Sequence, residues 1–278
     1  MMVALAVAAG LALLEWRMTA GNRNRECNGY GALAGTLRRN NAAPMRYRVL
    51  VPWVLLGLGR VVRLVRRRGI TVQAWHYQVV KGLLMWGSLA VAERLVGLAG
   101  MLAVAVLVAS TFEFDYWDCY AELLGVGLCV MGSPWAALAG GVIWGLSRET
   151  AILAPALGLL AGGPWAGLAA VSGPAAMLGV RLVQGRAALY CERWTMRAYN
   201  VPDLVKARGQ GDVGLWLSIG WTVVGIVTAV WGRGRMPAAL AATMPVALVW
   251  LVAGWTMARA RETRVFMPLA LWIAAAVR

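Results

Sequence analysis

Apolar stretches separated by short polar breaks run through almost the whole chain. A helix needs about 20 apolar residues to cross the hydrocarbon layer of a membrane, and several of these stretches are shorter. The pattern predicts an all-α fold: a polytopic transmembrane helix bundle with about eight to ten membrane segments, several of them short or re-entrant. The apolar stretches cover about 2–16, 49–65, 79–92, 95–112, 119–132, 134–147, 150–163, 165–183, 213–231, 237–257 and 265–277.

The polar breaks divide this bundle without marking a second domain. Between 119 and 163 the breaks are only a few residues long, so neighbouring stretches either form broken helices or merge into fewer, longer spans. Glu93 and Arg94 fall between two stretches, where a tight helical hairpin would fit. Three longer polar segments, 17–47, 60–69 and 184–212, are expected outside the bilayer. We therefore predict a single transmembrane domain, 1–278.

Composition supports a membrane protein and argues against a soluble domain. Hydrophobic residues make up 60% of the chain and charged residues only 14%, against about 25% charged in soluble proteins. The 15 tryptophans suit anchoring at the headgroup level. We expect an integral membrane protein of the cytoplasmic (inner) membrane of a bacterium.

The net charge of +15 comes mostly from arginines spread over short loops, which favours contact with anionic membrane lipids over nucleic acid. The arginine-rich segment around Arg66 is predicted to be cytoplasmic, which places Glu26 on the opposite side. Because the chain has one histidine and no CxxC pair, a zinc site or histidine-based triad is unsupported, and no metal or cofactor is expected.

Two similar charged strings interrupt the apolar sequence and provide the first candidate site. Ser147-Arg148-Glu149-Thr150 lies between two apolar stretches, and Ala260-Arg261-Glu262-Thr263-Arg264 precedes the last one. We call residues 148–150 and 261–264 the two Arg-Glu-Thr islands. Charged residues in such surroundings usually pair with each other or line a polar cavity. Two interpretations of these charged strings are open: a structural ion pair between helices, and a ligand site.

Four motifs resemble the GT-C superfamily of membrane glycosyltransferases, of which this chain would be a minimal, divergent member. Their order along the chain is similar, although Glu26 stands where superfamily members usually have aspartate in the first external loop. The motifs are Glu26-Cys27-Asn28-Gly29-Tyr30, Arg46-Tyr47-Arg48-Val49-Leu50-Val51-Pro52, Arg148-Glu149-Thr150-Ala151 through Pro155, and Arg261-Glu262-Thr263-Arg264-Val265-Phe266-Met267-Pro268-Leu269.

The resemblance implies transfer of a sugar from a polyprenyl-phosphate-linked donor to an acceptor at the external leaflet. Such a reaction needs a carboxylate to deprotonate the acceptor and cations to stabilise the departing phosphate. Glu26 is the expected base, although it could instead be a solvated carboxylate neutralising nearby arginines. The expected substrate-binding residues, with the two glutamates orienting the arginines, are Arg148, Glu149, Arg261, Glu262, Arg264, Tyr30 and Arg48.

A second acidic cluster, Phe112-Glu113-Phe114-Asp115-Tyr116-Trp117-Asp118, mixes three acids with four aromatic residues. Aromatic faces with nearby carboxylates suit sugar rings, but the same composition suits an interfacial belt. Asp115 is a second candidate catalytic acid. The alternative function is a non-enzymatic subunit or scaffold of a membrane protein complex, with membrane protein partners in place of a lipid-linked sugar. A small-molecule transporter would be expected to show two related halves, and no such repeat is evident.

Overall fold

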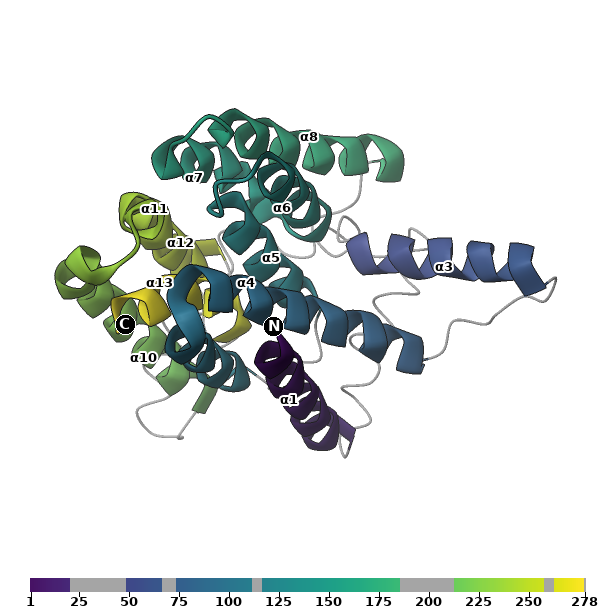
Figure 1. Cartoon of the computed structure of the whole chain (residues 1–278), viewed down its shortest axis with the longest axis horizontal. Helices are drawn as coiled ribbons and strands as arrows, with labels where there is room; N and C mark the ends of the chain where they lie inside the picture. The colour runs from purple at the N-terminus through teal and green to yellow at the C-terminus, as the bar shows by residue number, and fades with distance from the viewer. Residues whose placement is uncertain (21–48, 67–73, 112–116, 186–212, 258–262, 278) are drawn as a thin grey trace.

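The computed structural model describes residues 1–20, 49–66, 74–111, 117–185, 213–257 and 263–277, and these residues are helical without any strand. The predicted all-α class is confirmed for this part of the chain. Figure 1 shows helices α5 to α8 above the long helix α4, with α10 to α13 on the opposite side from α3. The α-helices are α1 (Met2–Ala20), α3 (Leu50–Arg66), α4 (Ala74–Ala109), α5 (Asp118–Cys129), α6 (Pro134–Ser147), α7 (Ala154–Ala161), α8 (Ala166–Gln184), α10 (Val213–Val227), α11 (Ala238–Ala242), α12 (Met244–Met257) and α13 (Ala270–Ala276).

Short helices of other types connect several of these α-helices. A 3-10 helix precedes α7 and another precedes α13, and a π-helix followed by a 3-10 turn extends α10. Proline residues fall at the first turns of α6 and α7, where a missing backbone N–H costs nothing. The connecting elements are η2 (Glu149–Leu153), η3 (Thr228–Gly232), η4 (Arg233–Arg235) and η5 (Thr263–Leu269).

Three helical stretches in the described residues are long and apolar enough to cross a membrane: His76–Ala109, Ala166–Gln184 and Val213–Arg235. The expectation of eight to ten segments is too high by this measure, because many apolar stretches form helices shorter than a full span. The prediction that at least two segments are too short is confirmed by the shorter apolar helices Met2–Glu15, Glu149–Ala161, Met244–Thr256 and Val265–Ala276. The three long stretches are compatible with an integral membrane protein.

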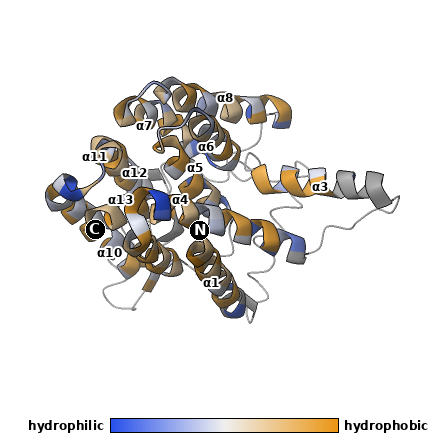
Figure 2. Cartoon of the chain, viewed as in Figure 1, coloured by the Kyte–Doolittle hydropathy of each residue, from blue (hydrophilic) through white to orange (hydrophobic). Residues whose placement is uncertain are grey.

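Apolar side chains cover the outside of the bundle as well as its interior. Figure 2 shows hydrophobic colour on nearly every helix, including outward-facing turns. Trp135 is 78% exposed, Leu182 is 77% exposed and Val106 is 71% exposed. Such a surface is costly in water but suits lipid tails.

Helix α4 bends sharply at Gly97, and this bend replaces the break expected at Glu93 and Arg94. Gly97 has φ 75° and ψ 179°, a conformation that side chains other than glycine rarely adopt. Glu93 and Arg94 remain helical, three to four residues before the bend. The stretch 79–92 and most of the stretch 95–112 therefore lie in two helical segments of α4 that meet at the kink at Gly97.

Small residues bring α5, α6 and α8 into close contact. A methyl group added to Gly125 would lie 2.8 Å from Cβ of Trp144 and 2.9 Å from the carbonyl oxygen of Gly140. At Gly141 it would lie 2.9 Å from the backbone nitrogen of Gly173 on α8. Small residues allow membrane helices to approach closely, and here they bring α5 directly against the end of α6.

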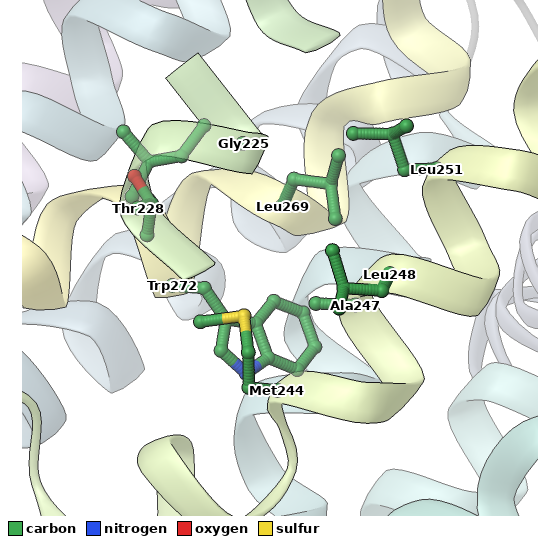
Figure 3. Close-up of a pocket in the computed structure, with 9 residues that line it drawn as sticks. Gly225, Thr228, Met244, Ala247, Leu248, Leu251, Leu269 and Trp272 are labelled. Carbon is green, nitrogen blue, oxygen red and sulfur yellow. The ribbon is translucent and has the colours of Figure 1, made fainter. Parts of the chain in front are cut away.

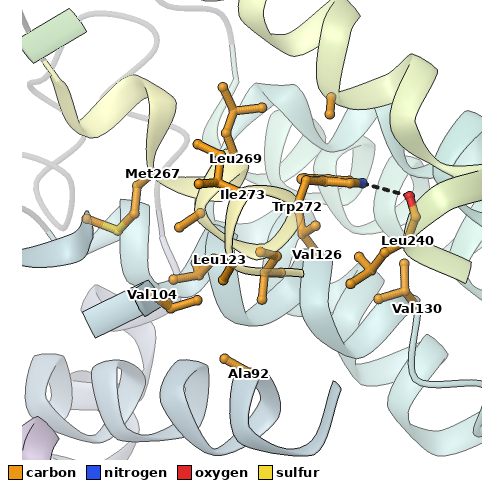
Figure 4. Packing of buried hydrophobic residues seen from close by; sticks show 14 of the residues in the cluster. Ala92, Val104, Leu123, Val126, Val130, Leu240, Met267, Leu269, Trp272 and Ile273 are labelled. Carbon is orange, nitrogen blue, oxygen red and sulfur yellow. Dashed lines mark hydrogen bonds between the residues drawn. The ribbon is translucent and has the colours of Figure 1, made fainter. Parts of the chain in front are cut away.

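The C-terminal helix α13 is the centre of the apolar core, with all seven of its residues buried. Figure 4 shows Trp272 among side chains of α4, α5 and α11, with its indole N–H donating to the carbonyl oxygen of Leu240 at 3.1 Å. This core places η5, which leads into α13, against α5. The second Arg-Glu-Thr island therefore leads directly into the most buried helix.

Candidate functional site: a buried arginine between two carboxylates

The start of α5 and the end of α6 meet at a cluster of buried charged side chains. Asp118 and Glu122 are four residues apart on α5, so their carboxylates lie on one face of the helix. Arg148 ends α6 in an extended conformation, with φ −149° and ψ 152°. Its backbone N–H donates to the carbonyl oxygen of Trp144 at 2.9 Å. The chain thus stops being helical at the residue whose side chain contacts α5.

The Arg148 guanidinium binds both carboxylates of α5. Its Nε–H donates to Oδ2 of Asp118 at 2.9 Å, and its Nη1–H donates to Oε2 of Glu122 at 2.7 Å. The side chains are only 7%, 2% and 0% exposed for Arg148, Asp118 and Glu122. Charge-assisted bonds of this kind are the strongest in proteins, so they fix α5 against α6. We call Asp118, Glu122 and Arg148 the buried triad.

Two further side chains extend the buried triad. The Thr150 hydroxyl donates to Oε1 of Glu122, and the indole N–H of Trp144 donates to Oγ1 of Thr150 at 3.1 Å. Glu122 is therefore held at both oxygens. The first Arg-Glu-Thr island contributes two residues to this network, Arg148 and Thr150.

The buried triad holds two carboxylates against one guanidinium. Asp118 lies in the first turn of α5, where the helix dipole favours a negative charge, and the Thr150 hydroxyl stabilises Glu122. Ionisable side chains inside an apolar bundle are expensive and often have a functional reason.

A second buried ion pair joins α1 to α4. Nζ of Lys81 lies 3.1 Å from Oε2 of Glu15, and the two side chains are 1% and 0% exposed. The Lys81 ammonium also lies 5.8 Å from the centroid of the Tyr77 ring. Tyr77 in turn belongs to the same apolar cluster as Trp117, the residue before Asp118. The two ionic sites are thus neighbours through one cluster of buried side chains.

Only part of the predicted site lies within the described residues. Arg148 is at the centre of the buried triad. Glu149 is half-buried in η2, and the backbone of Arg264 lies in η5. The remaining predicted site residues lie outside the described residues: Glu26, Tyr30, Arg48, Asp115, Arg261 and Glu262.

The described residues that flank these motifs nevertheless meet around the buried triad. The backbone N–H of Val49, next to Arg48, donates to the carbonyl oxygen of Leu146 at 2.9 Å. Asp118 itself follows Asp115 by three residues.

The flank of the second island is linked to the buried triad through two tryptophans. Trp144 stacks on Trp250 with ring centroids 5.4 Å apart and an interplanar angle of 15°. The indole N–H of Trp250 donates to the carbonyl oxygen of Val265, next to Arg264, at 3.2 Å. The flanks of two motif-bearing segments thus lie at one end of α5 and α6, and the flank of the second island is linked to them through Trp250 and Trp144.

Sequence reasoning missed Glu122 and did not assign Asp118 a partner. The available signal was the same one that singled out Arg148: a charged residue inside an apolar stretch needs an opposite charge. Asp118 and Glu122 have the four-residue spacing that one guanidinium can bridge. Applying that rule to every intramembrane acid would have suggested the pairing with α5.

A small apolar pocket lies between the C-terminal helices, apart from the buried triad. Figure 3 shows its side chains, of which Thr228 contributes the hydroxyl. The pocket has an empty volume of about 230 Å³, including the space at its mouth. Its lining suits a hydrocarbon group, not a charged one. The lining residues are Gly225, Thr228, Met244, Ala247, Leu248, Leu251, Leu269, Trp272 and Ile273.

Among the residues that the structure describes, no group of three or more histidine, cysteine, aspartate or glutamate side chains is placed to hold a metal ion. Comparisons with models of protein families, with curated proteins and with solved structures found no match to this chain.

Proposed function

We propose that this protein is a membrane glycosyltransferase that moves a sugar from a polyprenyl-phosphate-linked donor to an acceptor at the external leaflet. One observation carries the proposal: the described flanks of the motif-bearing segments are linked to the buried triad. Val49 and Asp118 lie at one end of α5 and α6, and Val265 is linked to that end through Trp250 and Trp144. A site built from several segments on a rigid base is what group transfer requires.

In this proposal the buried triad positions other residues. Arg148 already binds two carboxylates, and these disfavour a second anion beside them. The donor phosphate is therefore assigned to Arg261 and Arg264 of the second island, with Arg48 as a further cation. Glu26 deprotonates the acceptor hydroxyl, and Asp115 is the second candidate for that step.

Helix length supports a site below the membrane surface. Helix α5 has 12 residues and α6 has 14, so they extend about 18 Å and 21 Å at 1.5 Å per residue. A hydrocarbon layer is about 30 Å thick. If the 130–133 turn lies at one membrane surface, helices of this length place the buried triad inside the hydrocarbon layer. The apolar pocket beside Trp272 is a candidate contact for the prenyl chain.

The test is transfer by the full chain in proteoliposomes that contain polyprenyl-phosphate-linked hexoses and pentoses, each with a radiolabelled sugar. We expect Glu26→Gln to reduce transfer by about 10²–10⁴-fold, because a base that acts during proton transfer contributes that much. Glu93→Gln, a change on α4 away from the motifs, is the matched control and should retain activity. If Glu26→Gln retains full activity, another acid must be the base. Asp115→Asn then tests whether that acid is Asp115.

A second candidate function is a non-enzymatic subunit or scaffold of a membrane complex. The observation in its favour is the pairing of Arg148 with Asp118 and Glu122 inside the bundle, which is how a purely structural charge would be satisfied. If the wild-type protein transfers no sugar and binds none of the lipid-linked donors in a flotation assay, the scaffold function replaces the transferase.

A further inference from the structure

One uninterrupted chain of contacts connects the two Arg-Glu-Thr islands. In the first island, Arg148 and Thr150 both bind Glu122. Thr150 accepts a hydrogen bond from Trp144, whose ring stacks on Trp250. Trp250 donates to the carbonyl oxygen of Val265, the residue that follows the second island.

The two tryptophans are well suited to fix the relative position of the segments that they join. Trp144 is 0% exposed and Trp250 is 1% exposed, so neither ring can move without displacing its neighbours. A Cβ on Gly125 would lie 2.8 Å from Cβ of Trp144, so only hydrogen fits beside that ring's attachment point. Each indole also uses its N–H for a hydrogen bond, which fixes the rotation of the ring as well as its centre.

We propose that Trp144 and Trp250 are positioning residues that hold the first Arg-Glu-Thr island and η5 (Thr263–Leu269) in one fixed arrangement. This inference rests on the proposed transfer site, in which the second island binds the donor phosphate and the first is fixed to α5. A displacement of about 1 Å between such parts can reduce the rate of catalysis by about 10²-fold. The stack therefore acts on turnover through the islands and touches no substrate itself.

Hydrogen exchange measures the coupling without any substrate. In Trp144→Ala, amide exchange in η5 (residues 263–269) should become about fivefold faster, although Trp250 and not Trp144 bonds Val265. In a Trp250→Ala background the same change should have little further effect, which is the signature of two residues acting through one contact. Leu157→Ala on α7 removes an equally buried side chain outside the stack and should leave η5 unchanged.

Phenylalanine variants keep the test usable if the alanine variants fail to fold. Trp250→Phe retains a ring in the stack but loses the bond to Val265, so exchange in η5 should rise. Trp144→Phe retains the ring and loses only the bond to Thr150, so exchange in η5 should stay near the wild-type rate while η2 exchanges faster. Equal behaviour of η5 in the two phenylalanine variants would overturn the proposal.

Turnover supplies the second measurement. We expect Trp144→Ala to reduce kcat about tenfold or more while KM for the lipid-linked donor changes less than about threefold, with Trp144→Phe largely rescuing kcat. A rise in KM with unchanged kcat would overturn the positioning role. Hydrogen exchange in the single and double tryptophan variants needs no substrate, so it tests the coupling even if the wild-type chain transfers no sugar. Failure of the coupling and failure of the transferase are therefore distinguishable.

Discussion

Two buried ionic sites in this bundle provide partners for charged side chains in different ways. Between α1 and α4, one ammonium faces one carboxylate, Lys81 and Glu15. Between α5 and α6, one guanidinium bridges two carboxylates, and a hydroxyl and an indole extend the network. The first site sets one acid against one base, whereas the second sets two acids against one base.

The difference indicates which site has a role beyond stability. A balanced buried pair serves to register two helices, and replacing both partners by apolar residues is often neutral. The second carboxylate of the triad, Glu122, adds contacts to Arg148 and Thr150, but it also buries a second acidic group beside Asp118. Two of the motif flanks, Val49 and Asp118, lie beside this site, which fits a functional role.

The largest effect is expected for Arg148→Ala. This change leaves two carboxylates buried side by side without a cation, which should cost about 5 kcal/mol, the upper end for breaking a buried pair. Thermal unfolding of the purified protein in detergent measures the loss, and yield of folded protein reports it if purification fails. Arg148→Lys keeps the positive charge but lacks the planar guanidinium that bonds two carboxylates at once, so it should recover only part of the stability. If Arg148→Ala were as stable as the wild-type protein, the buried triad would make no contribution to stability.

A smaller but still large effect is expected at the balanced site. Glu15→Gln leaves the Lys81 ammonium facing a neutral amide and should cost about 3 kcal/mol. The double variant Glu15→Gln, Lys81→Met should recover most of that loss, since neither charge remains. Thermal unfolding of the single and double variants gives the coupling between the two positions. A double variant as unstable as the single one would mean that Lys81 acts mainly through other neighbours.

The sequence could predict the class of the fold and one member of the site. Apolar runs predict helices well because a run of that length has few alternatives in a membrane. Arg148 was identified because a charge within such a run needs a reason. Helix lengths were harder to predict, since the break between 79–92 and 95–112 depends on the backbone conformation of Gly97 and not on the polar residues Glu93 and Arg94.

The partners of Arg148 could not be read from local sequence. Asp118 and Glu122 lie 30 and 26 residues before it, and only the close packing of α5 on α6 brings them together. That packing depends on Gly125 and Gly140, which look like any other glycines in a chain with 33 of them. The stack of Trp144 on Trp250 joins helices 106 residues apart for the same reason and gave no signal in the sequence.

An intermediate effect is expected for Thr150→Val, which has nearly the same shape but lacks the hydroxyl. The change removes the donor to Glu122 and the acceptor for Trp144, and a hydrogen bond to a charged group contributes about 1.5–3 kcal/mol. Thermal unfolding should show a loss in that range. Thr256→Val, an exposed hydroxyl that bonds within its own helix, is the matched control and should have almost no effect. Equal losses at the two positions would indicate that the hydroxyl of Thr150 is not used by the triad.

The smallest effect is expected for Glu122→Gln, although the residue is completely buried. The amide keeps one oxygen for Arg148 and the same volume, and Asp118 remains as a carboxylate partner of the guanidinium. We therefore expect the free energy of unfolding to change by less than about 1 kcal/mol, against about 3 kcal/mol for the same substitution at Glu15. Thermal unfolding of the two glutamine variants side by side makes the comparison directly. A loss at Glu122 as large as that at Glu15 would show that both carboxylates are needed to hold Arg148. A neutral Glu122→Gln that also lowers sugar transfer would identify the second carboxylate of the triad as one retained for function and not for stability.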